Sequence, residues 1–300
     1  MRKILLIPLD YYKHIEHPEL FSDLITAFNK KTETKIYTTQ DEAINFSPDV
    51  ILFQGSLSVG DLAELKEHTK AKVAMWTGDF RYAPTQSLMD YKQVADLYLL
   101  PFCGEQLLIY ENILAKPCYF LWEYIQDWRF IEPKTLESGD VVFVGNCYEA
   151  FGNDRVELID FLAKHVPGFK AYGSCPQTNG MINYKDVPNL YNNSYLVIAE
   201  NNWHDVNGYF TPRNLAAMSA GSCCMHHYFP GIEKYFENFV DSVIYKHKYE
   251  LLDQINFLKA NPQVSNAIAK KGHEVAKVKY KTDIWVDCFL KIVTNTQIIL

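Results

Sequence analysis

Long apolar runs are absent from this 300-residue sequence. No stretch approaches the roughly 18 consecutive apolar residues that a helix needs to cross a membrane. The apolar run that begins at Ile4 is broken by Pro8 and Asp10, so it is too short for the core of a secretion signal. The run instead predicts a first buried strand, and we expect a cytoplasmic protein without a membrane span.

An excess of positive charge is also missing. The chain has 29 Lys and Arg residues against 36 Asp and Glu residues, which gives a net charge of −7 at pH 7. Because phosphate binding needs clustered lysine and arginine, this balance argues against a large nucleic-acid surface but leaves room for a local basic groove. The lysine-rich residues 270–281 are more typical of the solvated face of a helix.

The sequence lacks the usual cofactor and metal motifs. It has no D-x-D motif, and residues 8–12 contain none of the glycines of a dinucleotide-binding loop. The seven cysteines include no C-x-x-C pair, and their odd number favours buried free thiols in a reducing compartment. The run CCMHH at residues 223–227 offers metal-ligand side chains, but neighbouring strand residues point to opposite faces. We therefore expect no metal and no cofactor.

The first 125 residues alternate short apolar segments with longer amphipathic ones. Continuous apolar strands separated by helices are typical of a parallel sheet that helices cover on both faces. The predicted strands are residues 3–10, 35–39, 49–55, 72–80, 96–102 and 118–123. The predicted helices are residues 17–32, 58–69, 87–95 and 105–116.

The alternation stops at residues 126–139, which contain Pro133 and Gly139 and show little periodicity, so this segment is predicted to be a linker. It restarts with predicted strands at residues 141–145, 169–173, 195–200, 222–226 and 242–245, and with helices at 155–166, 187–193, 212–220 and beyond 249. The sequence thus predicts an α/β fold of two Rossmann-like, doubly wound parallel-sheet lobes, residues 1–125 and 140–300, facing a cleft. Ligands of such sheets bind beyond the carboxyl ends of the strands.

The most informative stretch is NGYFTPRNLAAMSAG at residues 207–221, a glycine-bearing loop that leads into a helix. Pro212 is favoured in a first helical turn, and Arg213 follows it. A positive helix end with a guanidinium fork can bind a diphosphate. The stretch is equally consistent with a closely packed alanine-rich helix whose arginine forms a surface ion pair.

The second half of the chain contains an ordered series of motifs. They are VVFVGN (141–146), Arg155, AYG (171–173), LYNNSYLVIAEN (190–201), NGYFTPRNLAAMSAGS (207–222), FPGIEKYF (229–236) and the closing helices of residues 257–291. This series resembles the C-terminal lobe of GT-B glycosyltransferases of the group 1 type, and among them the CgeB-like spore-maturation branch. In the first half the resemblance rests on topology and on MWTGDFR (75–81). The resemblance also implies that the last helix, near residues 283–294, crosses back to the first lobe.

The resemblance implies a nucleotide-sugar site in the second lobe. Gly145 and Asn146 match a glycine turn beside the donor diphosphate, and Tyr172 with Gly173 would lie near the nucleobase. Arg213 would stabilise the leaving nucleoside diphosphate without a metal ion. One residue departs from the pattern, because Ala216 replaces the glutamate that typically holds the ribose. Together with the loop before the helix, the donor-binding candidates are Gly145, Asn146, Tyr172, Gly173, Asn201, Asn207, Gly208, Tyr209 and Arg213.

Asp79 is the best candidate of the first lobe, because it follows a predicted strand and a glycine. Its carboxylate could deprotonate an acceptor hydroxyl, or it could cap the next turn. His204, in the loop before the donor motif, could touch the sugar. The acceptor-side candidates are Asp10, Tyr11, Asp79, Arg81 and His204, and the catalytic candidates are Asp79 and Arg213.

The sequence therefore predicts a metal-independent glycosyltransferase that moves a hexose or pentose from a nucleotide-diphosphate sugar to a hydroxyl. The acceptor is either a glycan or small molecule, or a hydroxymethylated base of phage DNA, which would have to be taken out of the base stack. The alternative is a non-catalytic two-lobed protein that binds a nucleotide or a sugar, which Ala216 would suit.

Overall fold

The computed structural model describes residues 2–8, 19–78, 80–147, 154–176 and 178–294. These residues form two compact units. Unit 1 comprises the chain up to Gln126, the short stretch Val206–Tyr209 and the chain from Thr282 onward. Unit 2 comprises Asp127–Asp205 and Phe210–Lys281.

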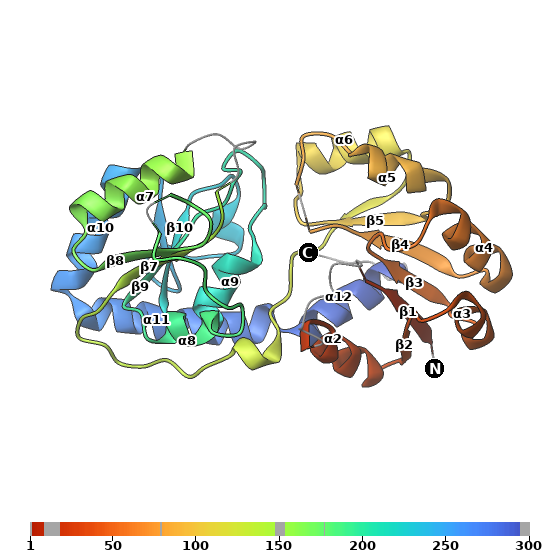
Figure 1. Ribbon diagram of the computed structural model, residues 1–300, viewed down its shortest axis with the longest axis horizontal. Helices are drawn as coiled ribbons and strands as arrows, with labels where there is room; N and C mark the ends of the chain where they lie inside the picture. The colour runs from red at the N-terminus through yellow and green to blue at the C-terminus, as the bar shows by residue number, and fades with distance from the viewer. Residues whose placement is uncertain (1, 9–18, 79, 148–153, 177, 295–300) are drawn as a thin grey trace. The chain divides into compact units, whose positions relative to one another are not determined.

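Unit 1 is built on a six-stranded parallel sheet (Figure 1) with the strand order β2-β1-β3-β4-β5-β6. The strands are β1 (Lys3–Ile7), β2 (Glu33–Ile36), β3 (Val50–Phe53), β4 (Lys72–Trp76), β5 (Leu97–Leu100) and β6 (Cys118–Phe120). The helices are α2 (Glu19–Asn29), α3 (Gln40–Phe46), α4 (Val59–Thr69), α5 (Gln86–Asp90), the 3₁₀ turn η1 (Tyr91–Gln93), α6 (Glu105–Leu114) and α12 (Thr282–Val293).

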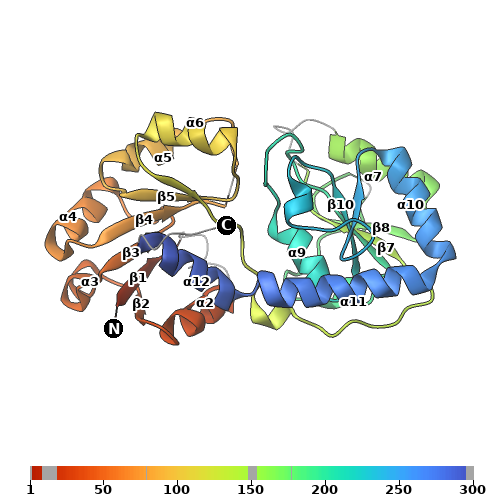
Figure 2. The ribbon, with the colours of Figure 1, turned by 180° about the vertical axis from the view of Figure 1, so that it is seen from behind.

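The central strand β3 of unit 1 is apolar at every position because helices cover both faces of the sheet. All four residues of β3, Val-Ile-Leu-Phe, are buried. Helices α2 and α12, from opposite ends of the chain, lie side by side on one face (Figure 2). In α12, Trp285 is fully buried and its indole N–H donates to the Trp122 carbonyl at 2.7 Å. The chain's last described helix thus completes the core of unit 1.

Unit 2 contains a second all-parallel sheet, of five strands, in the order β11-β10-β9-β7-β8. The strands are β7 (Val141–Val144), β8 (Phe169–Tyr172), β9 (Leu196–Ala199), β10 (Cys223–His227) and β11 (Val243–Tyr245). The helices are the 3₁₀ turn η2 (Asp127–Arg129), α7 (Asp154–His165), α8 (Val187–Asn192), α9 (Pro212–Ser219), the 3₁₀ turn η4 (Ile232–Lys234), α10 (Lys248–Ala260) and α11 (Pro262–Lys279). Helices α7 and α10 pack together, as do α8, α9 and α11 (Figure 1).

Helix α9 lies close to its surroundings because its side chains are small. Residues Asn214 to Ser219 are all buried. Gly221, just beyond the helix, has a φ of +72°, and a Cβ there would lie 2.6 Å from the Cα of Pro133. Only glycine fits this turn.

The segment predicted to be a linker has little regular structure, and most of it lies along unit 2. The Ile131 N–H donates to the Ser219 carbonyl at 3.1 Å. The Leu136 N–H and carbonyl both bond the side-chain amide of Asn266, at 3.0 Å each. This packing holds the connection between the two sheets against α9 and α11.

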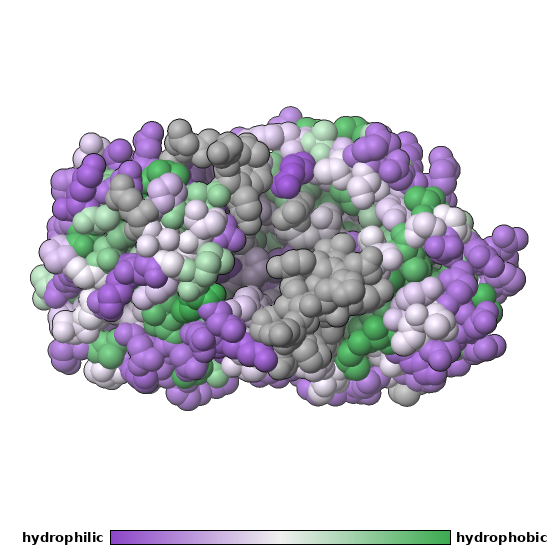
Figure 3. All heavy atoms as spheres, in the orientation of Figure 1, coloured by the Kyte–Doolittle hydropathy of each residue, from purple (hydrophilic) through white to green (hydrophobic). Residues whose placement is uncertain are grey.

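The predicted fold class, two doubly wound α/β lobes with parallel sheets, is confirmed. Helix α3 is an element that the sequence did not predict, and several predicted strands extend beyond the observed ones, by up to four residues. Among the described residues, no helix is both long and apolar enough to span a bilayer. On the face shown in Figure 3, hydrophilic residues are spread over both units with smaller apolar areas between them.

Candidate functional site

The strand order of unit 2 reverses direction between β7 and β9. From β7 the chain moves outward to β8, then returns to β9 on the other side and continues to β10 and β11. In an open parallel sheet, the loops at such a switch point leave in opposite directions, and the crevice between them is the usual ligand site. Here the two loops begin at Gly145 and at Glu200.

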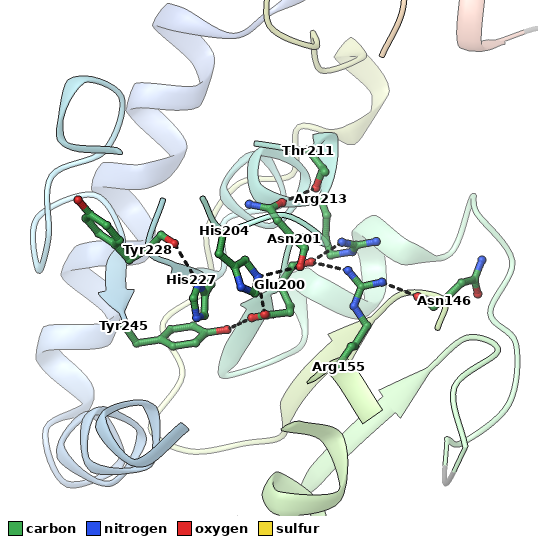
Figure 4. A network of polar contacts seen from close by, with 10 residues as sticks. All are labelled: Asn146, Arg155, Glu200, Asn201, His204, Thr211, Arg213, His227, Tyr228 and Tyr245. Atoms are coloured by element: carbon green, nitrogen blue, oxygen red, sulfur yellow. Dashed lines mark hydrogen bonds and ion pairs between the residues drawn. The ribbon is translucent and has the colours of Figure 1, made fainter. Parts of the chain in front are cut away.

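Two arginines bridge these strand ends (Figure 4). Arg213 donates from Nε to the Val144 carbonyl and from Nη1 to the Glu200 carbonyl, at 2.6 Å each. Arg155, from α7, donates from Nη2 to the same Glu200 carbonyl at 3.1 Å and from Nη1 to the Asn146 carbonyl. Backbone carbonyls thus fix both guanidinium groups at the switch point.

A cavity of about 380 Å³ opens at this place. Arg129, Arg155 and Arg213 contribute to its wall, and no carboxylate does among the described residues. The lining residues are Arg129, Val144, Gly145, Asn146, Arg155, Gly173, Met181, Ile182, Tyr184, Val187, Tyr191, Asn202, Pro212, Arg213 and Ala216. A wall with three guanidinium groups and several apolar side chains suits an anion that carries a flat apolar part.

Glycine allows the loops after β7 and β8 to approach each other at the cavity. Gly173 has a φ of +128°, and a Cβ there would lie 2.0 Å from the Gly145 carbonyl oxygen. A Cβ on Gly145 would lie 3.1 Å from Nη2 of Arg213. Side chains at either position would therefore push the loop or the arginine out of place.

The prediction that all cysteines are free thiols is wrong for two of them. Cys147 and Cys175 form a disulfide and tie together the loops that follow β7 and β8. The two residues are 28 positions apart. They meet because neighbouring parallel strands end at the same edge of the sheet, which no local cysteine motif reveals. Of the remaining described cysteines, Cys223 and Cys224 are buried and free, as predicted.

Glu200 carries a second network on its side chain. One carboxylate oxygen lies 2.7 Å from Nε2 of His204, and the other accepts a hydrogen bond from the Tyr245 hydroxyl (Figure 4). Burial alone raises the pKa of Glu200, but the hydrogen bond and charge of His204 outweigh it and hold this pKa below its usual value. Burial lowers the pKa of His204, yet the Glu200 carboxylate raises it by more. Each group therefore favours the charged form of the other.

Glu200, His204 and His227 are a candidate metal-ligand set in the described part of the chain. The imidazole rings of His204 and His227 stack with centroids 3.6 Å apart and planes 25° apart. A metal ion lies in the plane of each imidazole that binds it, and two rings in this arrangement cannot share one ion. His226 points elsewhere, is fully buried and bonds Asn214, and burial lowers its pKa to about 3. The geometry therefore fits an ion pair between side chains better than a metal centre.

Unit 1 has a cavity of its own, of about 340 Å³, near the carboxyl ends of β3, β4 and β6. It contains the polar side chains of Gln54, Thr77, Arg81 and Glu123 next to Trp76. The two charged side chains of its described wall have opposite signs, so that part of the wall is close to neutral. It suits an uncharged polar group better than a polyanion.

The structure brings part of the predicted donor site together. Gly145, Asn146, Gly173 and Arg213 line the cavity of unit 2. Tyr172 ends β8, and Asn201 is buried, where its Oδ1 accepts a hydrogen bond from Thr211 Oγ1 at 3.0 Å. Asn207, Gly208 and Tyr209 belong to the stretch that groups with unit 1, and the Cys103 N–H donates to the Asn207 carbonyl at 3.0 Å.

The described residues among the predicted acceptor-side candidates are also divided between the two units. Arg81 lines the cavity of unit 1, whereas His204 lies in unit 2 beside Glu200. Asp10, Tyr11 and Asp79 lie outside the described residues.

Arg129 and Tyr184 were not predicted as site residues, although both line the cavity of unit 2. Arg129 lies in the presumed linker, and Tyr184 lies in a stretch without regular structure. No motif marks either residue. Arg155, which the sequence suggested only as one motif among several, forms the site together with Arg213.

The comparisons with known proteins agree with this architecture. Residues 155–290, a little under half of the chain, match the model of a family described as glycosyl transferase-like. A structure of HepE from Anabaena in complex with UDP and glucose is similar at a TM-score of 0.66 and 12% identity, over 98% of this chain and 100% of that one. Sucrose-phosphate synthase from Thermosynechococcus elongatus is similar at a TM-score of 0.67 and 10% identity, over 99% of this chain and 100% of that one. The lipopolysaccharide outer core galactosyltransferase WaaB is similar at a TM-score of 0.59 and 14% identity, over 98% of this chain and 100% of that one. No curated protein sequence matches significantly. The chain thus has the GT-B fold, and most of its second unit matches the glycosyl transferase-like family.

Proposed function

We propose that this protein is a glycosyltransferase that uses a nucleotide-diphosphate sugar, and that unit 2 binds the donor. The observation that carries the proposal is the cavity at the β7/β9 switch point, whose described wall has three arginines and no carboxylate. A nucleoside diphosphate combines a flat base with two phosphates, which is the chemistry that this wall complements.

The arginines also suit the reaction. When the glycosidic bond breaks, negative charge grows on the leaving diphosphate, and preorganised donors aimed at that charge lower the barrier. Arg213 and Arg155 are held in place by carbonyls before any ligand arrives, so little reorganisation is needed. In this proposal the guanidinium groups do the work that a magnesium ion does in other transferases, and the enzyme is metal-independent.

The comparisons support the proposal without naming the substrate. HepE was solved with UDP and with UDP-glucose, and WaaB is named as a galactosyltransferase. By analogy, we propose a uridine or related diphosphate sugar as the donor and a hexose as the transferred group.

For the acceptor we propose a hydroxyl-bearing glycan or small molecule, because the described wall of the cavity in unit 1 is polar with little net charge. A hydroxymethylated base of DNA, as a phage enzyme related to the CgeB-like branch would use, is the other candidate. It needs a phosphate-binding surface, which the net charge of −7 does not favour. Asp79 is the proposed general base, and the proposed location is the cytoplasm.

A thermal-shift screen with UDP, dTDP, GDP and ADP tests the donor site. A diphosphate present at 100 times its Kd should add about 2.7 kcal/mol to the free energy of unfolding. Hydrolysis of the matching nucleotide sugar without acceptor then tests catalysis. Stabilisation without hydrolysis or transfer would identify a non-catalytic nucleotide-binding protein, and the absence of any stabilisation would refute the proposal for unit 2.

A further inference from the structure

Arg129 is a buried cation without a counterion in the described part of the chain. Only 4% of its surface is exposed. No described carboxylate forms an ion pair with it, and none of its N–H groups has a hydrogen-bond acceptor among these residues. A buried guanidinium in this condition is costly to the fold, so its charge calls for a partner that binds there.

The surroundings of Arg129 hold its guanidinium rigidly. Its Cζ atom lies 4.1 Å from the ring centroid of Tyr184 and 4.8 Å from that of Trp128. The two aromatic rings are themselves in contact, with centroids 5.8 Å apart. While the two rings contact the guanidinium, Arg129 also lines the cavity, so a ligand there can approach its N–H groups.

Arg129 and Arg213 act on the same part of the cavity. Tyr191, which also lines it, is influenced by both charges. Burial raises the pKa of Tyr191 to about 12, and Arg213 and then Arg129 oppose the rise. Because Arg129, Arg213 and Tyr191 line one cavity, a single ligand in it can contact both guanidinium groups.

We propose that Arg129 binds the diphosphate of the donor as a third cationic ligand beside Arg155 and Arg213. This inference rests on the proposed function, and it assigns a ligand contact to the segment that joins the two sheets. A planar, fixed guanidinium matches the oxygens of a phosphate in two-point contact, which a lysine cannot reproduce.

The test compares Arg129→Met with the wild type in the full-length protein. Methionine retains the length and much of the packing of the side chain but has no charge. We expect the Kd of UDP to rise at least tenfold and the affinity for uridine to stay within twofold. In the ligand-free protein the melting temperature should stay equal or rise, because an unsatisfied charge has been removed. Lys134→Met is the matched control, since this exposed lysine of the same segment bonds Asn193 and does not line the cavity.

Equal affinity of Arg129→Met and wild type for UDP would overturn the inference. An equal loss of affinity for UDP, UMP and uridine would also overturn it, because such a loss would place Arg129 against the nucleoside. A lower melting temperature with unchanged UDP binding would assign Arg129 a purely structural role and also overturn it. Inorganic pyrophosphate separates this inference from the proposed function: pyrophosphate binding that depends on Arg129, without any nucleotide binding, would support the anion site while refuting the nucleotide donor. A wild type that binds neither would refute both.

Discussion

Replacement of Arg213 by alanine is the sharpest test of the site. The side chain uses Nε and Nη1 to bridge the Val144 and Glu200 carbonyls, while the group also lines the cavity. Arg213→Ala therefore removes a cation from the proposed diphosphate site and removes the hydrogen bonds that join two strand ends. These two losses have different sizes and can be measured separately.

The catalytic loss follows from the role of a preorganised donor. Removal of one such donor typically lowers kcat by about 10²- to 10³-fold, or about 2.7–4 kcal/mol of transition-state stabilisation. The structural loss is smaller. The Glu200 carbonyl keeps its bond from Arg155, whereas the Val144 carbonyl loses the Arg213 donor. At about 1 kcal/mol for a hydrogen bond, the free energy of unfolding should fall by about 1–2 kcal/mol.

The assay measures kcat and KM for transfer and, separately, denaturant unfolding. Arg213→Lys should recover little of the rate, because a point charge replaces a planar fork. Arg2→Ala, at an exposed arginine far along the chain from the site, is the matched control and should change neither quantity. Activity of Arg213→Ala within a few-fold of the wild type would refute the donor-site assignment.

Four further predictions test other parts of the proposal. The lowered pKa of Glu200 stabilises the fold above about pH 4.3, and the raised pKa of His204 stabilises it below about pH 6.5. The pair therefore stabilises the fold most between these two values, and its contribution weakens as His204 loses its proton at higher pH. His204→Gln should therefore lower the melting temperature clearly at pH 6 and less at pH 9, and a constant difference would contradict this. Reduction of the Cys147–Cys175 disulfide should lower the free energy of unfolding by up to about 3.5 kcal/mol and weaken donor binding, measured by unfolding and calorimetry with and without reductant. Asp79→Asn should lower transfer by about 10²- to 10⁴-fold with unchanged UDP affinity, and full activity would exclude its role as base. Transfer to DNA should fall steeply with salt and transfer to a glycan should not, so a salt titration of the rate separates the two acceptors.

The fold could be predicted almost completely from the alternation of strands and helices. Strands such as β3 and β9 are buried at every position, and this continuous pattern is what a sheet covered on both faces requires. The missed helix α3 consists of the seven residues QDEAINF, of which only two are buried, so it carries little apolar periodicity. Its start signal is the cap, where the Thr39 side chain accepts from the Glu42 N–H.

The site could be predicted only where a motif marks it. Gly145, Gly173 and Arg213 belong to recognisable turns and a helix start, and all three line the cavity. Arg129 belongs to a segment whose composition is that of a linker, and its burial comes from packing against Trp128 and Tyr184. The burial of such a residue depends on contacts between distant parts of the chain, which a one-dimensional pattern does not contain.

The two units show how one scaffold acquires different chemistry. Leaving aside β6, both sheets follow the same order, in which the second strand lies outside the first and the third to fifth extend on the other side. This order places a ligand site at the strand ends in each unit. In unit 1 the described wall of the cavity contains both Arg81 and Glu123, whereas in unit 2 the described wall holds three arginines. The backbone therefore determines where a ligand can bind in each unit, and the sign of the side-chain charge in the described walls is our reason for assigning the proposed diphosphate to unit 2.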